Sequence, residues 1–89
     1  MADPGLTGKE IQQIILEQFV PLRWYTRQEA IELVGKNGKL SDDDYRIIGS
    51  GEPQFNRRTS NALRDLVRKH GMLENNEITP GFWQYRIPE

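Results

Sequence analysis

The chain of 89 residues carries 12 Lys and Arg against 13 Asp and Glu, giving a formal net charge of −1, and it has no cysteine. This length fits one domain, and the lack of cysteine excludes disulfides, thiol nucleophiles and thiolate metal sites. No apolar run approaches the roughly 20 residues of a membrane span, and the first residues do not have the pattern of a signal peptide. We therefore expect a cytoplasmic protein without membrane association, with residues 1–6 as a loose start and 7–89 as one domain.

The first half of the chain predicts two capped helices. Sequences of the form S/T-x-x-E, which is the pattern of a capping box, begin at Thr7 and at Thr26. Apolar residues recur after each box at helical spacing, which predicts helices over about 8–19 and 27–34. Gly35 is expected to end the second helix in the left-handed conformation.

A short third helix is expected over about 42–48, because Ser41 precedes an acidic first turn. The three carboxylates of residues 42–44 would also suit a hard cation, but adjacent helical residues point about 100° apart and do not converge. We therefore expect a helix start and no metal site. The glycine-containing segment 49–54 lacks the lysine of a phosphate-binding loop and is expected to be a flexible connection.

The last third predicts a long helix followed by a β-hairpin. Asn56 as cap and Gly71 as stop give a helix over 57–70. Residues 72–87 then form two strand-like runs, and we expect the polar residues between them at the hairpin tip. Helices around a small core, closed by a C-terminal hairpin, make a mainly α, α+β fold of the winged helix-turn-helix kind. The connector before the second helix leaves room for one more short strand.

The long helix has two distinct faces at 100° per residue. The apolar face is expected in the core, and the opposite row has a spacing of i, i+4, i+7 and i+11. Five Arg and Lys residues against the single Asp65 give residues 56–71 a local charge of +4, with His70 neutral. The apolar face consists of Ala62, Leu63, Leu66 and Val67, and the opposite row of Arg57, Asn61, Arg64 and Arg68.

This row suits DNA better than it suits a merely solvated face. Arg binds guanine or phosphate bidentately, Asn binds adenine in the same way, and nearby carboxylates that would neutralise the row are almost absent. Ser60 is small enough for close approach to a base edge, and Arg58 or Lys69 would reach phosphate. Asn75 and Asn76, expected at the hairpin tip, would touch phosphate or the minor groove, or would only form the turn. The predicted DNA-binding residues are Arg57, Arg58, Ser60, Asn61, Arg64, Arg68, Lys69, Asn75 and Asn76.

Two further groups of side chains have simpler interpretations. His70 near a helix C-terminus fits the helix dipole, and one histidine without cysteine gives no basis for catalysis. Trp24, Tyr25 and Trp83 would suit an aromatic cage for a flipped or methylated base, but packing of the second helix against the hairpin explains them more simply. We expect no cofactor and no small-molecule substrate.

A set of positions within residues 40–87 forms a recognisable pattern: Ser50-Gly51, Phe55-Asn56-Arg57, Ala62, Leu66, Gly71, Leu73 and Gly81. With these positions, the segment resembles the latter half of the N-terminal winged-helix domain of Mrr-type restriction endonucleases. An acidic helix start at 40–44 precedes the motif in this chain, as it does in the family. A tryptophan commonly stands before the helical alanine in the family, whereas this chain has Asn61 there.

The resemblance implies a double-stranded DNA-binding module that serves the nuclease domain of a longer protein in a restriction system acting on foreign or modified DNA. The sequence has no Asp/Glu-x-Lys triplet, so we expect no enzyme activity from these 89 residues alone. Two other functions remain open: a winged helix that binds a partner protein, which the acidic balance favours, and a small transcriptional regulator.

Overall fold

The computed structural model describes residues 6–38, 40–49 and 51–88, and this part of the chain has an α+β fold. Of the expected loose start over residues 1–6, residues 1–5 lie outside the described residues, as does Ser50 of the family motif, whereas Leu6 is buried in the core. Four helices precede a hairpin, and a short strand between the first two helices joins the hairpin in one antiparallel sheet. The elements are α1 (Gly8–Gln18), β1 (Tyr25–Thr26), α2 (Arg27–Asn37), α3 (Asp42–Tyr45), α4 (Gln54–Arg68), β2 (Glu74–Thr79) and β3 (Phe82–Arg86).

Both predicted capping boxes are present. The Thr7 hydroxyl accepts a hydrogen bond from the backbone N–H of Glu10 at 3.2 Å, and the Glu10 carboxylate accepts one from the N–H of Thr7 at 3.1 Å. The box that starts α2 has the same arrangement. The predicted end of α2 at Gly35 is wrong, because the helix continues to Asn37 and ends at Gly38. A glycine inside a helix costs only about 1 kcal/mol, and the ring of Phe55 packs against this one.

The third helix is shorter than predicted, with one turn instead of two. After it, Ile47 forms an antiparallel bridge with Pro53, and the N–H of Gln54 donates to the carbonyl of Arg46 at 2.8 Å. Residues 46–48 therefore run antiparallel to the start of α4, and their backbone groups are satisfied there and not within a second helical turn.

The long helix α4 begins three residues before its predicted start. Pro53 occupies the N-cap position, and Asn56 lies within the first turn with its N–H donated to the Pro53 carbonyl at 3.0 Å. Asn56 is therefore not the cap. The helix ends at Arg68 with Lys69 as its C-cap, two residues before the predicted end at residue 70. Gly71, the predicted stop, follows with a φ of +62°, and the N–H of Met72 donates to the Leu66 carbonyl at 2.8 Å.

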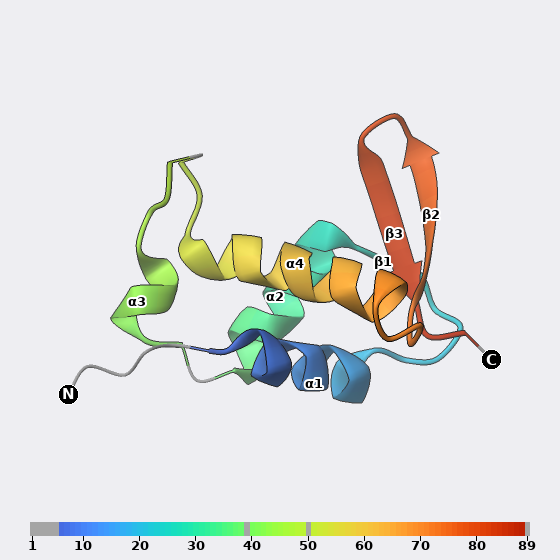
Figure 1. Cartoon of the computed structure of the whole chain (residues 1–89), viewed down its shortest axis with the longest axis horizontal. Helices are drawn as coiled ribbons and strands as arrows, with labels where there is room; N and C mark the ends of the chain where they lie inside the picture. The colour runs from blue at the N-terminus through green and yellow to red at the C-terminus, as the bar shows by residue number, and fades with distance from the viewer. Residues whose placement is uncertain (1–5, 39, 50, 89) are drawn as a thin grey trace.

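The core lies where α4 crosses α1 and α2 (Figure 1). The predicted apolar face of α4 is confirmed, because Ala62, Leu63 and Leu66 are buried and Val67 is partly buried. No helix in the described part of the chain is long and apolar enough to cross a bilayer. The other large contributions to the core come from Ile11, Ile15, Phe19, Tyr25, Ile31, Val34 and Phe55.

The sheet has the order β1-β3-β2, and its hairpin extends away from the helices near the C-terminal end of α4 (Figure 1). Asn75 pairs with Tyr85 and Asn76 with Gln84, so the two asparagines lie within strand β2. Their predicted position at the tip is wrong, because the chain reverses at Pro80-Gly81, where the glycine has a φ of +86°.

An irregularity in the pairing lies close to the tip. Glu77 is opposite Trp83, but the next pair along the hairpin is Thr79 with Phe82, so Ile78 is an extra residue in β2. This arrangement is a β-bulge, which keeps the ladder below it in regular register.

Candidate nucleic-acid interface

The row predicted on α4 is exposed along its whole length. Arg57, Asn61, Arg64 and Arg68 are all exposed, whereas the residues between them on the inner side of the helix are buried. The row therefore lies on the side of α4 that faces away from α1 and α2.

A crevice separates the outer side of α4 from the hairpin. It has a volume of about 310 Å³, and residues from both elements line it. Directly opposed residues in antiparallel strands share a face, so Asn75 and Tyr85, which line the crevice, share the inner face of the hairpin with Trp83. The helix contributes Ser60, Asn61, Arg64, Val67 and Arg68, and the hairpin contributes Asn75, Trp83 and Tyr85.

The polar side chains of this crevice are largely unpaired. Within the described residues, Asn61, Arg68 and Asn75 have no side-chain hydrogen bond or ion pair. Arg64 lies 3.9 Å from the carboxylate of Asp65, a separation at the outer limit of an ion pair. Amide and guanidinium donors are thus available in one place to a ligand.

Ser60 lines the crevice but already has a partner. Its hydroxyl oxygen accepts a hydrogen bond from Nε of Arg27, which also forms an ion pair with Glu52 at 2.9 Å. These contacts tie the start of α2 and the loop before α4 to the middle of α4, so Ser60 helps to hold the helix in place.

Arg58 lies outside the row and forms contacts within the fold. Its Nη1 lies 3.3 Å from the buried carboxylate of Asp44 and 3.3 Å from the carbonyl oxygen of Leu6. The same carboxylate accepts from the backbone N–H groups of Leu6 and Ser41. Asp44 therefore closes a buried junction between the N-terminal segment, α3 and α4, and the predicted phosphate contact of Arg58 is not favoured by this geometry.

Three other predicted residues lie outside the crevice. Arg57 is exposed at the start of the row but does not line the crevice. Lys69 follows the end of α4 with an exposed side chain 4.0 Å from Asp65. Asn76 lies on the outer face of the hairpin, because strand alternation places it opposite to Asn75.

The three aromatic residues proposed as a cage are not brought together. Tyr25 is buried and stacks on Phe19 with ring centroids 4.0 Å apart. Trp24 lies under the guanidinium of Arg86, 4.5 Å from the ring centroid, and Arg86 is on the outer face of the hairpin. Only Trp83, which is 41% exposed, borders the crevice.

Sequence reasoning named Asn75 as a DNA contact, but it missed Tyr85 and did not place Trp83 beside α4. The alternation of residues 82–87 places Trp83 and Tyr85 on one face of a strand, but nothing in the sequence shows that α4 lies beside that face. Burial raises the pKa of the Tyr85 phenol above its ordinary value of 10.0, and the nearby Arg27 partly offsets this. The phenol is therefore protonated at neutral pH and keeps its O–H donor.

The hairpin is poor in available cations. Its single basic residue, Arg86, forms an ion pair with Glu74 and stacks on Trp24, and Glu77 adds a negative charge near the tip. The positive charge of the site therefore comes from α4.

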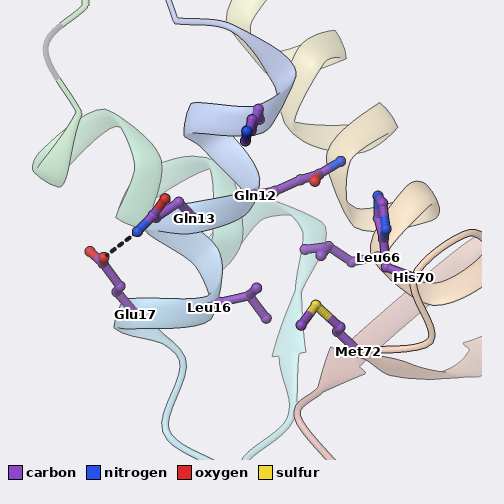
Figure 2. Close-up of a pocket in the computed structure, with 8 residues that line it drawn as sticks. Gln12, Gln13, Leu16, Glu17, Leu66, His70 and Met72 are labelled. Atoms are coloured by element: carbon purple, nitrogen blue, oxygen red, sulfur yellow. Dashed lines mark hydrogen bonds between the residues drawn. The ribbon is translucent and has the colours of Figure 1, made fainter.

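A second hollow, of about 290 Å³, lies between α1 and α4 on the other side of the helix (Figure 2). Leu16, Leu66 and Met72 form its apolar part, and Gln12 and His70 stand at its edge. No group of three His, Asp or Glu side chains suited to a metal ion occurs among the described residues. Its two charged lining residues, Lys9 and Glu17, have opposite signs, so this hollow lacks the net positive charge of the crevice.

Comparison of the chain with protein-family models, with curated proteins and with solved structures gave no match.

Proposed function

We propose that this protein is a winged helix-turn-helix domain that binds double-stranded DNA, with α4 in the major groove and the hairpin as the wing. The observation that carries the proposal is the crevice, where the exposed Arg and Asn row of α4 meets polar and aromatic side chains of the hairpin. A helix fits the major groove, and Arg and Asn are side chains that read guanine and adenine there.

The charge distribution supports DNA in spite of the acidic balance of the chain. Among the described residues, the three arginines of the row form no ion pair shorter than 3.9 Å, whereas Asp44, Glu52 and Glu74 form ion pairs with Arg58, Arg27 and Arg86, respectively. The carboxylates that lower the net charge are thus partly neutralised within the fold, away from the row.

The resemblance of residues 40–87 to Mrr-type restriction endonucleases supports a more specific role. In this proposal the domain is the specificity module of a restriction-type enzyme, and cleavage belongs to a separate nuclease domain. The domain contacts DNA and catalyses no reaction itself.

A protein-binding winged helix is the second candidate, and one observation favours it. Ile78 and Phe82 expose 53% and 69% of their surface near the hairpin tip. Exposed apolar side chains on a projecting element are typical of protein contacts.

Gel-shift or anisotropy titrations with alanine variants separate the two candidates. We expect Arg57→Ala, Arg64→Ala and Arg68→Ala each to weaken duplex binding by about 1–3 kcal/mol, because each removes a charged donor from the row. Lys9→Ala is the matched control, since it removes one positive charge from α1, which packs on the opposite side of α4. If all three row variants bind every tested duplex as the unchanged protein does, the row is only a solvated face and the protein-binding function replaces this one.

A further inference from the structure

The crevice faces one DNA strand if the proposed function holds. The major and minor grooves of a duplex are separated by a single sugar–phosphate backbone. With α4 in the major groove and the hairpin at the adjoining minor groove, that backbone passes over the gap between the two elements. The side chains that line the crevice would then meet nucleotides of this strand in addition to the base edges that the row of α4 reads in the groove.

The contents of the crevice match the chemistry of a single base. Trp83 offers an exposed aromatic ring, and stacking on such a ring suits every base because each has a π face. The unpaired amides of Asn61 and Asn75 each offer two donors and an acceptor, which suits the hydrogen-bonding edge of a base. Arg64 and Arg68 supply positive charge for the flanking phosphates.

The size of the crevice fits the same ligand. A volume of about 310 Å³ lies at the small end of ligand sites, which span roughly 300–1,000 Å³. Trp83 and Tyr85 also border an adjoining hollow of about 470 Å³ beside the start of α2, so the indole ring is not enclosed by protein. The crevice is thus a place for one ring system with its sugar, open on the side where the strand would pass.

The lack of available positive charge on the hairpin also favours a base as the ligand. Arg86 is engaged by Glu74 and Trp24, so the hairpin has no unpaired cation among its described residues with which to grip a backbone. Glu77, which is opposite Trp83 and shares its face, adds a carboxylate that disfavours a phosphate there. The three hairpin residues that line the crevice offer an indole, a phenol and an amide. These groups stack on a base and bond to its edge.

We propose, on the basis of the DNA-binding function above, that the crevice between α4 and the hairpin binds one unpaired or extruded DNA base, stacked on Trp83 and hydrogen-bonded by Asn61 and Asn75. Extrusion of a base is easiest where pairing is already lost, so a protein with such a pocket prefers a mismatch over a matched pair.

The test compares three duplexes with identical random-sequence flanks: one with a central T·A pair, one with a T·T mismatch, and one with abasic sites on both strands. We expect the T·T duplex to bind about tenfold more tightly than the T·A duplex, because it supplies a base that is already unpaired. The doubly abasic duplex is flexible but offers no base, and we expect it to bind like the T·A duplex.

Two variants locate the effect. Trp83→Ala should remove the preference for the mismatch, measured as the ratio of the T·T and T·A affinities of the same variant, and Trp83→Phe should keep most of it because the ring remains. Phe82→Ala is the matched control, since Phe82 is the neighbouring exposed aromatic residue and lies on the other face of the strand. It should leave the preference unchanged.

The outcomes distinguish this inference from the proposed function. If the T·A and T·T duplexes bind equally well, and this binding still depends on Arg64 and Arg68, the base pocket is overturned. The proposed DNA-binding function is then unaffected. The base pocket is also overturned if the preference for the T·T duplex persists in Trp83→Ala, or if the doubly abasic duplex is preferred over the T·A duplex to the same extent. Either result would indicate that the protein responds to the flexibility of the DNA. No binding to any duplex overturns both.

Discussion

Asp44 shows how one buried carboxylate can hold three segments together. It is fully buried, and its acceptors are used by the backbone N–H groups of Leu6 and Ser41 and by the guanidinium of Arg58. The sequence marked it only as one of three acids at a helix start. Its partners could not be foreseen, because Leu6 is 38 residues away and Arg58 is 14 residues away.

We predict that Asp44→Ala lowers the free energy of unfolding by about 3–5 kcal/mol, since it leaves buried donors without an acceptor and an arginine without its partner. Asp42→Ala, at an exposed position of the same helix, should change it by less than about 0.5 kcal/mol. Urea unfolding followed by circular dichroism measures both. A loss of under 1 kcal/mol for Asp44→Ala would show that the junction contributes little.

At the scale of elements, helix periodicity predicted which side of α4 enters the core, but local signals misplaced several boundaries. Asn56 is a residue type typical of an N-cap, yet α4 begins three residues before the predicted start, directly after the bridge between Ile47 and Pro53. Polar residues at 74–77 suggested a turn, yet they form a strand because β3 offers them partners. Tertiary pairing overrides local preference in both cases.

We predict that Leu66→Ala lowers the free energy of unfolding by about 2–4 kcal/mol, because this side chain is 1% exposed at the crossing of α4 with the other helices. Arg64→Ala, on the exposed side of the same helix, should change it by less than about 0.5 kcal/mol. Chemical unfolding of the two variants side by side provides the check. Equal losses would contradict the two-faced assignment of α4.

For the molecule as a whole, the position of the basic row on α4 matters more for DNA binding than the net charge of −1. The periodicity of α4 predicted the basic row, but the sequence could not show that the hairpin would complete a crevice beside it. That depends on the pairing of β1 with β3, which fixes the hairpin against the helices.

We predict that duplex binding weakens with salt along a slope of about −3 to −4 in log K against log salt, because Arg57, Arg64, Arg68 and Lys69 give about four phosphate or near-phosphate charges. Lys69→Ala should reduce the slope by about one and weaken all sequences alike. Titrations between 50 and 200 mM salt measure it. A slope near zero would contradict binding through the basic row.

The bulge at Ile78 has a consequence for how this domain can diverge. The regular pairing of Glu74–Glu77 with β3 is kept although Ile78 is an extra residue on the tip side of it. Insertions or deletions between Thr79 and Gly81 therefore need not change the pairing register of residues 74–77. The hairpin can therefore differ in length between related chains while Asn75 and Trp83 keep their positions beside α4. A reporter peptide inserted at the hairpin tip should likewise leave these positions unchanged.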